Sequence, residues 1–348
     1  MNKISVERGA LLAATLGMSL VGFAATAFAF LPPPEEDNST TVTQGATTQG
    51  SAQQVTGIIS DRLNSETGDG SQGSGSASLD ITGKAAGSTP ATRGLWFNAA
   101  ATSIDDDHVG ANYDGDIYTF LVGYDAFVGD KLRVGLAAGF ERILVDTNYN
   151  NGSVKSDAWT IAPYLAYQIN DMLSVNASVG RTWASYDINH ATSAVGSTDG
   201  ERWFGAANLV AKQTSGQWRF SETLGYFYVT ETQDAYTETG IGALVVPEST
   251  RHVGQLRIGG KAGYEIPVSF GSVTPFVSAR AEYDVSKSAD PILTSGATVS
   301  QDDTGATFGA GVKAAMGDNM TFSLEATTTA FRNDYEARML SATLSFKF

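Results

Sequence analysis

Long runs of period-two alternation constrain this chain more than any other feature of its sequence. In residues 132–141 the even positions carry only apolar side chains, whereas the odd positions include Arg133 and Glu141. Successive side chains of a strand point to opposite faces of a sheet, so this run predicts one apolar and one polar face. The same pattern predicts twelve strands, at 94–105, 115–128, 132–147, 155–169, 173–188, 201–214, 218–231, 251–266, 273–286, 304–316, 320–331 and 335–348.

The predicted strands are longer than those of ordinary globular sheets. Most exceed the ~9–11 residues that a tilted strand needs to cross a bilayer, whereas globular strands have about 5–6 residues. No helical layer is predicted among them to cover the apolar face, so the acyl chains of a membrane are the better partner. The predicted fold class is therefore all-β, a transmembrane antiparallel β-barrel of about 12 strands over residues 93–348.

The connections between these strands alternate in length. Short turns at residues 129–131, 170–171 and 317–319 contrast with polar loops such as 189–200 and 232–250. Transmembrane barrels have tight periplasmic turns and longer outer loops, so an even number of strands leaves both barrel ends in the periplasm. Aromatic residues near the predicted strand ends indicate interfacial girdles, and we assign to them Trp96, Trp159, Trp183, Trp203, Trp218 and Tyr228.

The polar face of the strands predicts the lining of the barrel. The residues that we assign to the lumen on this basis are Arg133, Arg257, Lys261, Arg280, Glu282 and Lys313. Side chains of both signs stiffen a barrel through ion pairs or bias permeating ions, and we favour stiffening. Arg181 and Glu222 break the pattern, because both occupy apolar positions. We expect Arg181 near the outer interface and Glu222 turned inward by a β-bulge.

The N-terminal region predicts export. Lys3 and Arg8 precede an apolar stretch that ends at Ala27-Phe28-Ala29, which predicts a cleaved signal peptide at residues 1–29, with an uncleaved anchor as the alternative. Residues 30–92 form a polar linker that buries too little apolar surface to order itself. One short helix near 53–64 interrupts it, and its apolar face consists of Val55, Ile58, Ile59 and Leu63.

Composition excludes several classes of function. A formal charge of −15 argues against a nucleic-acid partner. The chain has no Cys, which excludes disulfides, thiolate metal sites and lipid acylation of Cys. His108 follows three Asp residues, which leaves open a surface hydrolase or a calcium site, but a solvated acidic loop is the simpler interpretation. We therefore expect no enzymatic activity, no catalytic or metal site and no cofactor.

The C-terminal residues resemble the insertion signal of outer-membrane barrels. Apolar side chains recur at two-residue steps up to an aromatic last residue, and those assigned to the signal are Leu340, Leu344, Phe346 and Phe348. Residues 93–348 also resemble the autotransporter β-domain family. The resemblance lies in Gly94-Leu95-Trp96, in Asp116 to Asp125, in Gly129 to Gly139 and in Phe348.

This resemblance implies a twelve-stranded barrel with a helix through its lumen and a passenger on its N-terminal side. By position, the helix near 53–64 is the lumenal helix. The sequence departs from the family between Ala29 and Arg93, where there is no room for a β-helical passenger and no Asn-Asn pair of the kind that some members cleave. We therefore expect a passenger-less or short-passenger member.

The predicted function is an autotransporter-type barrel that inserts by its C-terminal strand and anchors a short N-terminal segment in or through the pore. The alternative is a porin-like channel for small polar solutes. We expect the protein in the outer membrane of a Gram-negative bacterium. Its expected partners are outer-membrane lipid, lipopolysaccharide, the barrel-assembly machinery and periplasmic chaperones, with no nucleic acid.

Overall fold

The computed structural model describes residues 39–64, 93–190, 194–240, 245–291, 299 and 302–348. They belong to one compact unit, residues 34–348. The predicted signal peptide and the linker residues 65–92 lie outside the described residues, so both assignments stay predictions.

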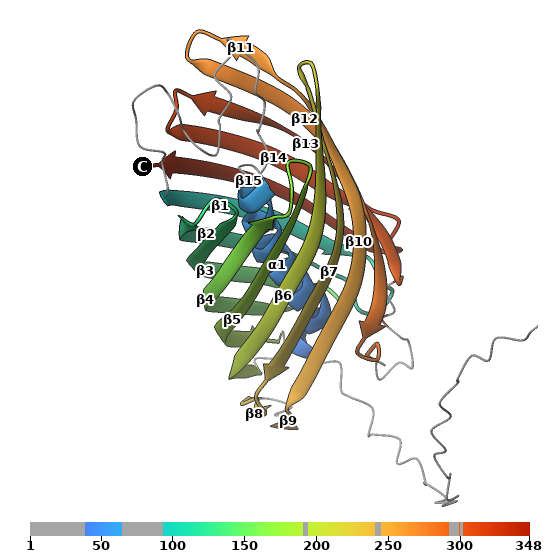
Figure 1. The fold of residues 1–348 in the computed structure, drawn as a ribbon. Helices are drawn as coiled ribbons and strands as arrows, with labels where there is room; N and C mark the ends of the chain where they lie inside the picture. The colour runs from blue at the N-terminus through green and yellow to red at the C-terminus, as the bar shows by residue number, and fades with distance from the viewer. Residues whose placement is uncertain (1–38, 65–92, 191–193, 241–244, 292–298, 300–301) are drawn as a thin grey trace, which may run out of the picture. The chain divides into compact units, whose positions relative to one another are not determined.

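One helix and a closed antiparallel barrel make up this unit (Figure 1). The helix is α1 (Ser39–Asn64). The strands are β1 (Arg93–Asp106), β2 (Tyr113–Val128), β3 (Leu132–Thr147), β4 (Gly152–Gln168), β5 (Leu173–Asn189), β6 (Val195–Ser215), β7 (Trp218–Gln233), β8 (Tyr236–Thr237), β9 (Val245–Val246), β10 (Ser249–Tyr264), β11 (Ile266–Val268), β12 (Gly271–Lys287), β13 (Thr304–Met316), β14 (Met320–Ala330) and β15 (Tyr335–Lys347).

The barrel wall consists of twelve strands, which confirms the predicted fold class. Each strand pairs with its neighbour in sequence, and the circle closes because β1 pairs with β15. The short β11 continues β10 along the edge of β12, so β10 and β11 together count as one strand of the wall. The β8–β9 hairpin forms a separate two-stranded sheet within the connection from β7 to β10. Closure leaves no open strand edge to be satisfied in lipid.

Alternate residues of each strand face the lumen and the outside. In β4 buried and exposed residues alternate from Val154 to Tyr167. The exposed side is apolar and includes Trp159, Ile161 and Leu165. One girdle assignment is wrong: Trp96 is fully buried and lies inside the barrel. It has the opposite parity to its neighbours Leu95 and Phe97, which the strand turns outward.

The helix is longer than the sequence predicts. It begins at Ser39 rather than near residue 53, and it runs through a stretch rich in Ser, Thr and Gln within the predicted linker. Most of its residues are buried, polar ones included. Figure 1 shows α1 inside the ring of strands. The barrel supplies the partners that this polar helix lacks in water.

β6 and β7 depart from the prediction in two places. β6 begins at Val195 rather than near residue 201, because it pairs with β5 up to Asn189. Glu222 is exposed on the outside of β7, and the pairing of β7 with both neighbours runs through it without a shift. The predicted inward bulge at Glu222 is therefore wrong. Arg181 also faces away from the lumen, at the ninth of the seventeen residues of β5, and it pairs with Glu201.

The helix-filled lumen as candidate functional site

The apolar face of α1 holds one side of the helix against the barrel wall. Val55, Ile58, Ile59 and Leu63 are all buried. They share a cluster with lumenal residues of the wall, namely Trp96, Ala100, Leu121, Ala137, Ala162, Tyr164, Ala166, Phe204, Phe227 and Val229. Burial of these side chains favours a docked helix over a free one.

A buried charge cluster fixes the C-terminal end of α1, at the end of the barrel with the short turns. Arg62 Nε lies 3.2 Å from Asp125 Oδ2, and Arg133 Nη2 lies 2.5 Å from Asp125 Oδ1. The Tyr164 hydroxyl donates to Asp125 Oδ2 over 3.0 Å, and the Trp96 indole N–H donates to Tyr164 over 2.7 Å. The helix, β2 and β3 are thus joined through one carboxylate.

A second cluster holds the middle of the helix. Ser51 forms hydrogen bonds with both Glu141 of β3 and Arg202 of β6. Arg202 also bridges the lumen, with Nη1 at 3.0 Å from Glu141 and Nε at 2.6 Å from Glu231 of β7. The Tyr186 hydroxyl donates to Glu231 over 2.7 Å. All of these side chains are buried, so each charge needs the partners that the cluster provides.

The N-terminal end of α1 lies at the long-loop end of the barrel. Ser39 Oγ is 3.0 Å from Thr147 Oγ1, and Thr40 Oγ1 is 3.2 Å from the Tyr236 hydroxyl of β8. Gln44 Oε1 accepts a hydrogen bond of 2.7 Å from Ser249. The helix therefore runs from the long loops at Ser39 to the short turns at Asn64.

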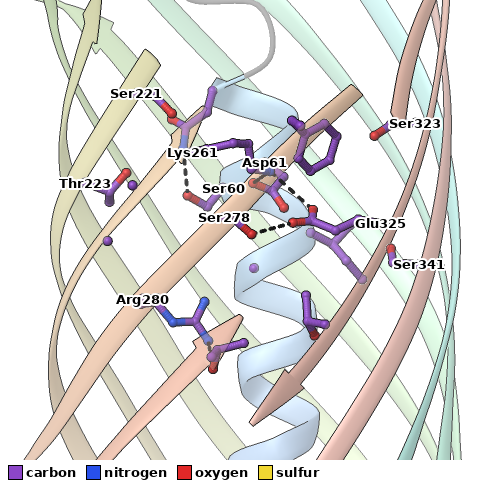
Figure 2. A pocket seen from close by; sticks show the side chains of 18 of the residues that line it. Ser60, Asp61, Ser221, Thr223, Lys261, Ser278, Arg280, Ser323, Glu325 and Ser341 are labelled. Carbon is purple, nitrogen blue, oxygen red and sulfur yellow. Dashed lines mark hydrogen bonds and ion pairs between the residues drawn. The ribbon is translucent and has the colours of Figure 1, made fainter. Parts of the chain in front are cut away.

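A polar slot remains along one side of the helix. The helix packs chiefly against β2 to β7 and β10. A cavity of about 450 Å³ separates it from β12 to β15, and Ser and Thr side chains form much of its lining. Figure 2 shows Lys261 crossing this slot. Its Nζ lies 3.4 Å from Asp61 of the helix and 3.2 Å from Glu325 of β14.

The structure places all six predicted lumen residues on the inside of the wall. Arg133 belongs to the cluster around Asp125, and Lys261 bridges the slot. Arg280 Nη2 pairs with Glu282 Oε1 at 2.7 Å. The guanidinium of Arg257 lies 4.0 Å from the centre of the Phe227 ring, and Lys313 lines the slot.

Several residues that hold the helix were not among the predicted ones. Glu141, Arg202 and Glu231 all have the inward parity of their strands, so alternation was the signal that identifies them as lumenal. Ser51 and Arg62 carried no such signal. They lie on a helix that carries polar residues on all sides. Only the closed barrel shows which of these residues form hydrogen bonds or ion pairs with the wall.

The three His residues lie toward the long loops, each in a different setting. His108 Nδ1 is 2.6 Å from Asp106, and His190 Nδ1 is 3.2 Å from Glu238. His252 Nδ1 is 2.9 Å from Ser288 Oγ. Among the described residues, no group of three or more His, Asp or Glu side chains is placed to hold a metal ion.

Ion pairs also join the connections at the long-loop end. Lys287 donates a hydrogen bond to Asp303 over 2.8 Å, which holds the pKa of that carboxyl below its usual range. Burial acts to lower the pKa of Arg332, but the hydrogen bond and charge of Asp284 outweigh burial and raise it. Arg332 Nη1 lies 3.1 Å from Asp284.

No helix within the described part of the chain is both long and apolar enough to cross a membrane.

Comparison with known proteins decides the family. The family model "Autotransporter beta-domain" matches residues 95–327. The chain belongs to the autotransporter β-domain family. An outer-membrane autotransporter barrel with its N-terminal helix in the pore accounts for the lumen described above, and an open porin-like channel is not favoured. The protein resides in the outer membrane of a Gram-negative bacterium, into which barrels of this family are inserted by the assembly machinery.

Solved autotransporter structures share the fold of this barrel. The translocator domain of NalP from Neisseria meningitidis has a TM-score of 0.70 and 16% identity, over 89% of this chain and 99% of that one. The β-domain of Bordetella BrkA has a TM-score of 0.60 and 13% identity, over 74% of this chain and 100% of that one. The transport unit of AIDA-I from Escherichia coli has a TM-score of 0.54 and 10% identity, over 78% and 95%.

Two curated relatives extend well beyond this barrel. Both are named Esterase EstA, from Pseudomonas aeruginosa and Pseudomonas putida, and each is 24% identical over 180 residues. The match covers 49% of this chain and 28% of the relative. The chain therefore spans little more than a quarter of the length of these relatives.

The family fixes the direction of this autotransporter barrel in the membrane. Short turns face the periplasm and long loops face the outside, so Asn64 lies at the periplasmic end and Ser39 at the outer end. Trp159, Trp183 and Trp203 are exposed on the outer wall. Trp159 and Trp183 are cross-strand partners toward the outer end, whereas Trp218 adjoins a periplasmic turn.

Proposed function

We propose that this autotransporter barrel holds α1 as a fixed plug and thereby presents whatever precedes Ser39 at the cell surface. The direction of the helix carries this proposal. Its periplasmic end is held through Arg62 and Asp125, and its outer end through Ser39 and Thr147. A segment joined to Ser39 therefore leaves at the outer mouth, where Ser39 and Thr40 contact Thr147 of β3 and Tyr236 of β8.

The processing of the chain belongs to the same proposal. Residues 1–29 act as a cleaved signal peptide, residues 30–38 precede the plug, and residues 65–92 link the plug to β1. The C-terminal strand supplies the insertion signal through Leu340, Leu344, Phe346 and Phe348. Periplasmic chaperones escort the unfolded barrel, and lipopolysaccharide surrounds its outer half.

We do not extend the esterase activity named in the two relatives to this chain. The pair of His252 and Ser288 resembles a base and a nucleophile, but within the described residues no carboxylate forms a hydrogen bond or ion pair with His252. A hydrolytic triad needs such a third group to orient its base. This supports a role for the described barrel in anchoring rather than in hydrolysis.

Surface accessibility tests the proposed direction. An epitope followed by a protease site is inserted between residues 36 and 37, and a matched variant carries the same insertion between residues 78 and 79. In intact cells, added protease removes the first epitope and spares the second, which becomes sensitive only after the outer membrane is permeabilised. Protection of the first epitope in intact cells contradicts the proposal.

A gel assay keeps this test separate from failure of the barrel to fold. Closed barrels that resist unheated detergent migrate differently before and after boiling. Both insertion variants are expected to show the mobility shift of the parent. The protease result is then read only on barrels that have closed.

A further inference from the structure

Glu222 is an outward-facing carboxylate in a membrane-spanning strand. It is exposed on β7, between the outward side chains of Phe220 and Leu224. Within the described part of the chain, its carboxylate has neither a hydrogen bond nor an ion pair. Three arginines of the outer wall differ, because each is ion-paired to a neighbouring carboxylate: Arg142 to Asp157, Arg181 to Glu201 and Arg338 to Glu336.

The position of Glu222 along the strand places it near the periplasmic leaflet. It lies four residues from Trp218, the first residue of β7 after the periplasmic turn. At ~3.3 Å per residue and a tilt of ~35–45°, four residues rise about 10 Å. An ionised carboxylate within the apolar band is costly unless a cation meets it.

Aromatic rings line the path from Glu222 to the periplasmic interface. Trp218 stacks on Phe220, with ring centres 5.9 Å apart, and meets Tyr264 of β10 edge-on at 5.1 Å. All three rings are partly exposed on the outer wall. A carboxylate together with aromatic faces is the combination that binds ammonium groups, since ring faces attract cations electrostatically.

Small residues leave room for such a group beside Glu222. The cross-strand partners of Glu222 are Ala211 on β6 and Gly260 on β10. The partner of Phe220 on β10 is Ala262. The outer surface of the barrel therefore has a shallow recess beside Glu222, because the neighbouring side chains are small there and larger at Leu224 and Phe220.

The position of the other cations favours a lipid over a second copy of the chain. Among the described strands, the outward cations of the strand interiors lie at the midpoint of a strand (Arg181) or in the half toward the long loops (Arg142, Lys155 and Arg338). A second barrel in the same orientation brings none of these to the depth of Glu222. Phospholipid headgroups carry ammonium at this interface, on the side of the membrane where Glu222 lies.

We propose that Glu222, with Phe220, Trp218 and Tyr264, binds the ammonium headgroup of a phospholipid in the periplasmic leaflet. The ammonium group lies above Gly260 and Ala262, with Glu222 on one side and the rings on the other. The proposal rests on the outer wall facing lipid, as the autotransporter barrel requires.

Native mass spectrometry of the purified barrel tests the site. The full chain is mixed with equal amounts of phosphatidylethanolamine and phosphatidylglycerol that have identical acyl chains. We expect at least tenfold preferential retention of phosphatidylethanolamine, reduced to near parity in Glu222→Gln and lowered in Phe220→Leu. Asp187→Asn removes an exposed carboxylate at the opposite rim of the wall and is expected to keep the preference.

Two further measurements keep the outcome decisive. N-acetylated phosphatidylethanolamine lacks the positive charge, so the unaltered protein is expected to lose its preference for it. The heat-dependent gel shift shows that each variant is a closed barrel, which separates failure of this site from failure of the fold. Equal retention of the charged and acetylated lipids, an unchanged preference in Glu222→Gln, or a dimer that depends on Glu222 overturns the proposal.

Discussion

Trp96 of β1 packs directly against Gly123 of β2. The indole of Trp96 lies over Gly123, so that a Cβ at Gly123 would overlap the ring. The same indole N–H donates to Tyr164, which in turn donates to Asp125 of the helix anchor. Gly123 thus gives Trp96 the space from which it supports the anchor.

Gly123→Ala is expected to destabilise the barrel by about 1–3 kcal/mol, the usual cost of adding a methyl group to a filled interior. The temperature at which the unheated gel band converts to the unfolded one measures this loss. Trp96→Leu removes the ring, so Gly123→Ala in that background should cost much less. Equal costs in both backgrounds would show that the indole is not what excludes the methyl group.

The helix anchor around Asp125 predicts unequal effects of its two kinds of partner. Asp125→Ala leaves the buried guanidiniums of Arg62 and Arg133 without their shared carboxylate, a loss on the order of 3–5 kcal/mol. Arg62→Ala costs less, because Arg133 still pairs with Asp125. Thermal unfolding of the two variants in detergent should rank them in this order, and the reverse order would contradict the pairing.

The glycines of α1 differ in their surroundings and give a matched set at the scale of the element. A Cβ at Gly45 or Gly57 meets nothing within 4 Å, whereas one at Gly50 lies 3.3 Å from Ile117 Cδ1. Gly45→Ala and Gly57→Ala are expected to stabilise the helix by roughly 0.5–1 kcal/mol each. Gly50→Ala should gain less or lose stability. Thermal unfolding of the three variants measures the difference, and identical effects would mean that the wall does not contact the helix at Gly50.

The strands of this molecule were predictable because apolar and polar side chains alternate along them. The helix was predictable only where Val55, Ile58, Ile59 and Leu63 give it an apolar face. Its first half contains β-branched Thr and many polar residues, which have little tendency to form a helix alone. That half is helical because the lumen supplies partners such as Ser249 for Gln44, and no local pattern records them.

The whole barrel decides which inward charges meet, and this is where prediction from sequence stopped. Parity assigns Glu141, Arg202 and Glu231 to the lumen, but only closure brings β3 across from β6 and β7. Glu222 shows the opposite limit. The sequence predicts a bulge that turns its charge inward, yet uninterrupted pairing with Ala211 and Gly260 fixes Glu222 on the outside of the barrel. Register over a full strand outweighs the cost of one charge near an interface.

Closure at the last strand predicts a separation between assembly and stability. Backbone bonds join Phe348 to Arg93 in both directions, at 3.1 and 3.2 Å, and they survive substitution of the side chain. Phe348 is 58% exposed, so Phe348→Ala should change the stability of the folded barrel by no more than about 1 kcal/mol. If the terminal ring is the insertion signal, the same variant should lose most of its assembly in cells.

Leu324→Ala is the matched control for this prediction. Leu324 is an exposed, outward apolar residue of the adjoining strand β14. The fraction of heat-shifted barrel in isolated outer membranes is expected to fall several-fold for Phe348→Ala and to change little for Leu324→Ala, while both refold in detergent like the parent. Equal assembly of the two variants would mean that the terminal ring is one more lipid-facing side chain, and that the signal for insertion lies elsewhere in the strand.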